Sequence, residues 1–164
     1  VGPAYSMTTI GILGGGRFVR MIALAGAPLG LRFLVMDSAA DACAAQFVPL
    51  LGADYRDEAA LAEFARRVDV VTFDFENVPA ESAQWLAERV PVFPSPRALA
   101  VAQDRLAEKS LFRELGIAVP AFSAVATREQ LEHASARHRA LLYVPSGGIS
   151  GLDALKAAYA AGVD

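Results

Sequence analysis

The chain has 164 residues, of which 54% are hydrophobic and 20% are charged, and it carries a formal net charge of −3 at pH 7 with a sequence pI near 5.4. This length and composition indicate a globular protein with either one ordinary domain or one domain plus part of a second, and they exclude a disordered chain. Lysine and arginine form no long run, and no stretch reaches the roughly 18 apolar residues of a membrane span, so we expect neither nucleic acid nor a membrane as partner.

The cysteine content and the first residues of the chain indicate the cellular compartment of the protein. Cys43 is the one cysteine and lies among small and apolar residues, which is typical of a buried thiol. The start of the chain lacks the charged and then apolar layout of a signal peptide, and residues 1–6 look like a remnant of an expression vector. We therefore expect a cytoplasmic protein whose fold begins at Met7.

Apolar runs of strand length alternate with amphipathic stretches along nearly the whole chain. The expected strands are residues 9–13, 32–37, 69–79, 91–95, 117–125 and 140–144. The expected helices are residues 17–27, 40–47, 56–68, 80–90, 96–116 with a break near Gln103, 128–137 and 152–162. This alternation is typical of βαβ units. It predicts an α/β fold, a Rossmann-like doubly wound three-layer sandwich with a mainly parallel sheet.

The pattern also predicts how the chain is divided and which residues share a helix face. Residues 7–116 are expected to form a Rossmann-like nucleotide-binding domain, and residues 117–164 a strand-helix-strand-helix tail that either closes the same sheet or begins a truncated second unit. Thr127 and Gln130 predict a capping box in that tail. Apolar residues recur at helical spacing as Phe18, Met21, Ile22 and Ala25, as Leu61, Phe64, Ala65 and Val68, and as Trp85, Leu86 and Val90.

Three glycines follow the first expected strand directly. Gly14 and Gly16 match the G-x-G-x-x-G pattern of dinucleotide-binding turns, but Val19 stands at the third position, where it should push the helix away from the strand. Asp37 lies 21 residues after Gly16 at the end of the second strand, the spacing at which an acid holds a ribose of NAD. The glycines therefore either bind a phosphate, as in an NAD site, or only turn the chain.

A second polar cluster follows the apolar run that begins at Asp69. Asp74 and Glu76 alternate with aromatic residues, so an extended strand would place both carboxylates on one face. Glu76 can accept two hydrogen bonds from ribose hydroxyls, and Asn77 can cap or bind beside it. The alternative is a solvated strand end that caps the next helix.

Several segments together resemble one enzyme family. The stretches "IGILGGG", "VDVVTFDFENVP" and "FPSPRALAVAQDRLAEKSLFRELGI" are similar to the amino-terminal domain of N5-carboxyaminoimidazole ribonucleotide synthetases, with the likeness covering about residues 8–131. The resemblance implies a purine-biosynthesis ligase of the ATP-grasp type, which uses ATP and Mg²⁺ to carboxylate aminoimidazole ribonucleotide and is typically a dimer. It implies a phosphate role for Gly14, Gly15, Gly16 and Arg20, and a ribose role for Glu76.

The sequence also departs from that family. Arg17, Phe18 and Val19 stand where it usually has Gln-Leu-Gly, so Arg17 either adds an anion contact or faces solvent. Tyr143 stands about where an ATP-binding lysine belongs, so we expect an incomplete ATP site and no cofactor for this chain alone.

The tail and the histidines complete the sequence-based expectations. Residues 141–164 resemble a segment of aspartate dehydrogenases, which suggests a chimera. His133 and His138 have no cysteine or acid cluster nearby, so we expect no metal site. The leading hypothesis is a domain that binds a small-molecule ribonucleotide through Gly14–Gly16, Arg17, Arg20, Glu76 and Asn77. The alternatives are an NAD-binding fragment that uses Gly14, Gly16 and Asp37, and a recombined or designed module without a ligand, whose open sheet edges would favour self-association.

Overall fold

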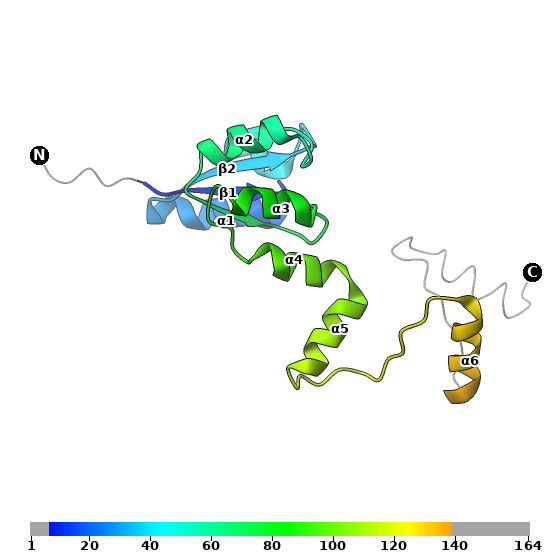
Figure 1. The fold of residues 1–164 in the computed structure, drawn as a ribbon. Helices are drawn as coiled ribbons and strands as arrows, with labels where there is room; N and C mark the ends of the chain where they lie inside the picture. The colour runs from blue at the N-terminus through cyan, green and yellow to red at the C-terminus, as the bar shows by residue number, and fades with distance from the viewer. Residues whose placement is uncertain (1–6, 139–164) are drawn as a thin grey trace, which may run out of the picture. The chain divides into compact units, whose positions relative to one another are not determined.

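The structure, a computed structural model, describes residues 7–138 of the chain (Figure 1). The chain divides into two compact units, Val1–Val119 and Pro120–Asp164, and each is described by itself. None of the helices in the described part has the length and apolar character needed to cross a membrane. The expected strand 140–144, the expected helix 152–162, Tyr143 and the dehydrogenase-like tail lie outside the described residues.

The first unit is built on a four-stranded parallel sheet with the strand order β3-β2-β1-β4. The strands are β1 (Thr9–Leu13), β2 (Arg32–Asp37), β3 (Leu50–Gly52) and β4 (Val70–Phe73). The α-helices are α1 (Arg17–Gly26), α2 (Glu58–Arg66), α3 (Ala80–Ala87), α4 (Pro96–Gln103) and α5 (Arg105–Glu114), and the 3-10 turns are η1 (Ala27–Leu29) and η2 (Cys43–Gln46). The predicted α/β fold with a parallel sheet is confirmed.

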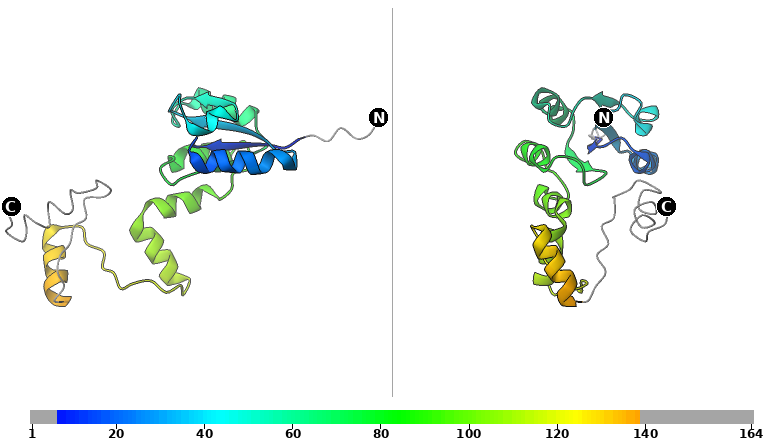
Figure 2. Two further views of the ribbon diagram at one scale, coloured as in Figure 1. Left: turned by 180° about the vertical axis from the view of Figure 1, so that it is seen from behind. Right: turned by 90° about the vertical axis from the view of Figure 1, so that its right-hand side faces the viewer.

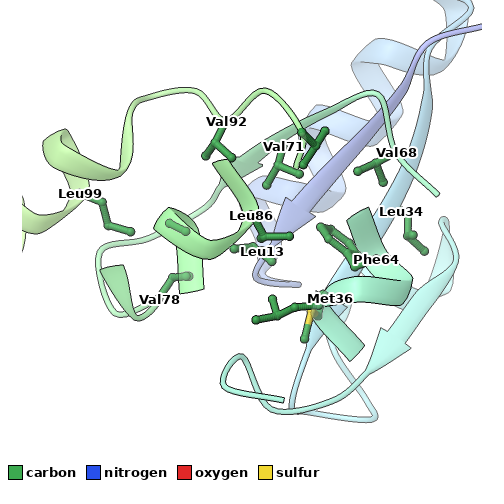
Figure 3. Packing of buried hydrophobic residues seen from close by; sticks show 13 residues of the cluster. Leu13, Leu34, Met36, Phe64, Val68, Val71, Val78, Leu86, Val92 and Leu99 are labelled. Atoms are coloured by element: carbon green, nitrogen blue, oxygen red, sulfur yellow. The ribbon is translucent and has the colours of Figure 1, made fainter. Parts of the chain in front are cut away.

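Side chains that alternate along the strands supply two cores, one on each face of the sheet. Ile12 packs with Val19 of α1, whereas the next residue, Leu13, belongs to the larger cluster that includes Phe64 of α2 and Leu86 of α3. Figure 3 shows this larger cluster from close by. The end-on view in Figure 2 shows α1 on one side of the sheet and α2 and α3 on the other, which gives three layers.

Helix α1 packs on the sheet with a different face from the one that carries its largest side chains. Phe18, Met21 and Ile22 are 70%, 61% and 45% exposed, whereas Val19 and Ala23 are buried. Both sets recur at helical spacing, so periodicity alone does not choose between them. The buried side chains of Val19 and Ala23 are smaller than the exposed ones, so they let the helix approach the sheet closely. Val19, expected to force helix and strand apart, is fully buried in the core beneath α1.

Several expected boundaries were wrong. The strand expected at 69–79 ends at Phe73. The strand expected at 91–95 is reduced to an isolated parallel bridge between Val71 and Val92, and the short strand β3 was not expected at all. The helix expected at 40–47 is the 3-10 turn η2. Residues 117–125 form no strand, because Pro120 lacks an amide hydrogen for a ladder and no neighbouring strand is paired with them.

The predicted helix ends agree with the structure more closely than the predicted strand ends do. Ser95 caps α4, with the Ala98 amide donating to Ser95 Oγ at 3.3 Å, and the helix breaks after Gln103 as expected. In the second unit, helix α6 (Arg128–His138) begins after Thr127, whose Oγ1 accepts from the Gln130 amide at 3.2 Å. Gln130 Oε1 in turn accepts at 2.7 Å from the amide of Ala126, one residue before the cap, so half of the predicted capping box is present and its return bond is shifted by one residue.

Candidate functional site

The glycine turn connects β1 to α1 at the carboxyl edge of the sheet. Gly14 has a φ of +104°, a left-handed conformation that residues with a Cβ rarely adopt. Its amide donates to the Met36 carbonyl of β2 at 2.9 Å, which holds the turn against the neighbouring strand. The sequence therefore forms a tight turn at the predicted place.

Two carboxylates of the chain itself face the other glycine amides. The Gly15 amide donates to Asp37 Oδ2 at 2.7 Å, and Asp37 Oδ1 accepts from the Ala39 amide at 2.8 Å. The Gly16 amide hydrogen-bonds the Asp74 carboxylate. A Cβ added to Gly16 would lie 2.8 Å from Asp74 Oδ2, so this carboxylate lies directly against the turn. All three glycine amides thus have acceptors within the chain.

The same edge of the sheet concentrates negative charge. Burial, and then the charge of Asp37, raise the pKa of Asp74 above its usual value, while the Gly16 amide opposes that shift. Burial also raises the pKa of Tyr55, and the Asp37 carboxylate adds to the effect by its charge and by accepting the phenolic hydrogen. An anion bound directly at the glycines would therefore lie close to the carboxylates of Asp37 and Asp74.

The polar residues after β4 lie on a turn and not on a strand, which corrects the expected shared face of Asp74 and Glu76. Because β4 ends at Phe73, the two carboxylates are free to diverge: Asp74 lies against Gly16, whereas Glu76 is exposed and lines a pocket. Phe75 is half-buried and meets the Tyr55 ring edge to face, with centroids 6.4 Å apart. The aromatic residue anchors the turn that presents Glu76 and Asn77.

An open pocket of about 480 Å³ lies beside this turn. Its lining is mostly polar and comes from the β4–α3 turn, the start of α3, the α4–α5 break and the segment before α2: Arg56, Glu76, Asn77, Pro79, Glu81, Ala102, Gln103 and Arg105. Arg105 also forms an ion pair with Glu108 at 2.7 Å. The pocket therefore combines cations, carboxylates and amides, a set that suits a ligand with hydroxyl groups and an anionic group.

The structure divides the predicted binding residues between two neighbouring places. Glu76 and Asn77 line the pocket, whereas the glycines, Arg17 and Arg20 are absent from its lining. The turn after β4 contacts the glycine turn, because a Cβ on Gly14 would lie 2.9 Å from the Phe75 ring. Arg17 is exposed at the start of α1.

Arg20 is held at another residue, Phe47, which does not line the pocket. Its guanidinium stacks over Phe47, with Cζ 5.7 Å from the ring centroid. Its Nε is buried and has no hydrogen-bond acceptor within residues 7–138. Among these residues, no group of three or more His, Cys, Asp or Glu side chains is arranged to hold a metal ion.

Sequence reasoning missed the residue that ties the pocket together, Gln103. Its Nε2 lies 2.6 Å from the Glu76 carbonyl and 2.6 Å from the Val78 carbonyl. The next residue, Asp104, caps α5 by accepting from the amides of Leu106 and Ala107. The break after Gln103 was the available signal, because a side chain at a helix end is free to bond with a neighbouring loop.

Comparisons with known proteins point to one family. Residues 7–103 match the family model described as "Ribonucleotide synthetase preATP-grasp domain". An N5-carboxyaminoimidazole ribonucleotide synthase of Pseudomonas aeruginosa is 48% identical over 127 residues, which is 77% of this chain and 35% of that protein. The chain thus spans about a third of the length of the curated relatives it matches.

Solved structures give the same result. The N5-carboxyaminoimidazole ribonucleotide synthetase of Thermus thermophilus superposes with a TM-score of 0.75 at 49% identity, covering 78% of this chain and 36% of that one. An Aspergillus clavatus N5-carboxyaminoimidazole synthase, solved with ADP and 5-aminoimidazole ribonucleotide, superposes with a TM-score of 0.71 at 26% identity, covering 80% of this chain and 36% of that one.

Proposed function

The chain belongs to the ribonucleotide synthetase preATP-grasp domain family, and we propose that it is the ribonucleotide-binding amino-terminal part of an N5-carboxyaminoimidazole ribonucleotide synthetase. Its ligand is 5-aminoimidazole ribonucleotide. The observation that carries the proposal is the turn after β4, which presents Glu76 and Asn77 to an open polar pocket at the carboxyl edge of the sheet. Ligands of open α/β sheets bind at this edge.

Glu76 is the residue we assign to the ribose. Glu76 is exposed and lines the pocket, and its backbone carbonyl accepts a hydrogen bond from Gln103. A carboxylate accepts from both hydroxyls of a ribose, which a single neutral acceptor does less well. Asn77 beside it supplies one further acceptor and two donors.

The phosphate contact is assigned to the start of α1. The glycine amides already have acceptors in Met36, Asp37 and Asp74, so an anion there competes with the chain's own groups. The next amides, those of residues 17–19, have no acceptor within their own helix because they form its first turn. Together with the Arg17 side chain, these amides attract an anion. The glycines have no side chains, so they let the anion come close to the start of the helix.

The proposal for this chain ends at binding. In the family, ATP and Mg²⁺ supply the activation of bicarbonate, and the residues assigned here to the pocket and to the start of α1 hold the ribonucleotide. A homodimer and a cytoplasmic location stay predictions. Size-exclusion chromatography with light scattering measures the molar mass of the protein in solution and so tests for the homodimer.

The NAD alternative also stays a prediction. It assigns the adenosine ribose to Asp37, whose two oxygens already accept from the Gly15 and Ala39 amides and whose carboxylate also accepts from Tyr55. No observation favours it over the ribonucleotide. Titration with NADH, followed by energy transfer from Trp85, distinguishes the two.

The deciding experiment is calorimetric titration of 5-aminoimidazole ribonucleotide into the 164-residue chain. We expect saturable binding that Glu76→Ala weakens by about tenfold or more, since a charge-assisted pair of hydrogen bonds is lost. Glu114→Ala, at an exposed site on α5, is the matched control and should bind like the parent. Absence of binding at millimolar ligand, or equal loss in both variants, would refute the proposal.

A further inference from the structure

Gln103 joins two segments that are far apart in the sequence. It is the last residue of α4, and its Nε2 donates to the Glu76 carbonyl, 27 positions away, and to the Val78 carbonyl, 25 positions away, both at 2.6 Å. Both partners are carbonyl oxygens, so only the nitrogen of the amide group satisfies them. The two amide hydrogens are thus both used on one turn.

Helix α4 is itself firmly placed. Ser95 caps its first turn, Pro96 begins it, and Leu99 is buried in the larger core, so the end of the helix is fixed relative to the sheet. The helix then stops because Asp104 caps α5. Gln103 therefore extends from a rigid base toward the turn after β4.

The turn that Gln103 reaches carries the binding residues. Val78 is buried and anchors its far end, whereas Glu76 and Asn77 are exposed and line the same pocket as Gln103. A turn with two exposed residues between the half-buried Phe75 and the buried Val78 has freedom to rotate unless its carbonyl groups are held. Gln103 holds the carbonyl groups on either side of Asn77.

We propose that Gln103 is a positioning residue that fixes the orientation of Glu76 and Asn77 and thereby sets the affinity of the pocket for the ribonucleotide. It acts on the ligand through the backbone of the turn. This inference rests on the proposed function for its effect on affinity, but its effect on the order of the turn stands independently of any ligand.

The variants separate donor chemistry from packing. Gln103→Met keeps the length and volume of the side chain without donors, and Gln103→Lys keeps donors on a longer side chain. We expect Gln103→Met to bind 5-aminoimidazole ribonucleotide about tenfold or more weakly, because two hydrogen bonds are lost, and Gln103→Lys to stay within a few-fold of the parent. Gln84→Met, at an exposed position on α3, is the control and should have no effect.

A ligand-free measurement tests the contact itself. Nuclear magnetic resonance on the parent chain should show scalar coupling across the hydrogen bonds from Gln103 Nε2 to the carbonyl carbons of Glu76 and Val78. In Gln103→Met the backbone amides of residues 76–78 should lose order on the fast timescale while circular dichroism stays that of a folded chain.

The outcomes are distinct. Absent coupling, or unchanged order at residues 76–78 in Gln103→Met, overturns the positioning role whatever the ligand does. A parent chain that does not bind the ribonucleotide, with coupling present and order lost in Gln103→Met, refutes the proposed function and upholds the positioning of the turn. Binding that is equal in the parent and Gln103→Met overturns the link to affinity.

Discussion

The Asp74 carboxylate lies against the Gly16 backbone so closely that a Cβ on Gly16 would be 2.8 Å from Asp74 Oδ2. The contact joins the end of β4 to the turn that precedes α1, and it places a carboxylate of the chain against the last glycine of that turn. The glycine turn is therefore stabilised by the protein before any ligand arrives.

The raised pKa of Asp74 predicts a dependence of stability on pH. Burial and Asp37 raise the pKa of Asp74 above its ordinary 3.8. A carboxyl whose folded-state pKa is raised contributes stability that is fully present below its unfolded pKa and is lost as pH rises through the folded value. We therefore expect Asp74→Asn, which keeps an acceptor for the Gly16 amide, to melt above the parent near pH 7 and to approach it near pH 3.5.

Thermal unfolding of both proteins across this range measures the difference. Asp41→Asn removes an exposed carboxyl and serves as the control. An Asp74→Asn variant that melts below the parent near pH 7 would contradict the prediction.

Two left-handed glycines make a matched pair for a test of crowding. Gly14 has φ +104°, and a Cβ there would lie 2.9 Å from the Phe75 ring. Gly30 has φ +77°, and a Cβ there would have no neighbouring atom within 4 Å. We expect Gly30→Ala to cost about 1 kcal/mol from backbone strain alone, and Gly14→Ala to cost about 3 kcal/mol because strain and a clash add. Urea unfolding gives both values, and equal costs would show that the Phe75 contact contributes nothing.

The orientation of α1 predicts that substitutions at two neighbouring positions change the free energy of unfolding by very different amounts. Val19 is fully buried, so Val19→Ala should lower the free energy of unfolding by about 2 kcal/mol. Phe18 is mostly exposed although it is the larger apolar residue, so Phe18→Ala should change it by less than about 0.5 kcal/mol. The reverse ranking in denaturant unfolding would mean that the helix packs by its other face.

Local sequence signals predicted the parts of the fold that local interactions determine. The first two strands, the glycine turn and the cap at Ser95 depend on residues within a few positions of one another, and all are found. The face of α1 was not predictable in this way. Both of its faces are apolar, and the choice depends on Phe33 and Val35, which come from another strand.

In the candidate site, too, contacts between residues distant in the sequence set features that local sequence signals do not predict. Glu76 and Asn77 lie on the turn after β4 and not on the strand expected at 69–79, because the strand end at Phe73, and with it the divergence of Asp74 from Glu76, depends on where pairing with Leu13 stops. The hydrogen bonds of Gln103 link positions 25 and 27 residues apart, and no periodicity or motif encodes them. Contacts between distant side chains and loops require the folded arrangement.

The internal acceptors of the glycine turn have an evolutionary consequence. Because Met36, Asp37 and Asp74 satisfy the turn from within, its shape does not depend on what α1 presents at its first exposed positions. Selection for folding and selection for ligand preference therefore act on different residues. Substitutions at the exposed Arg17 and Phe18 therefore leave the hydrogen bonds of the turn intact.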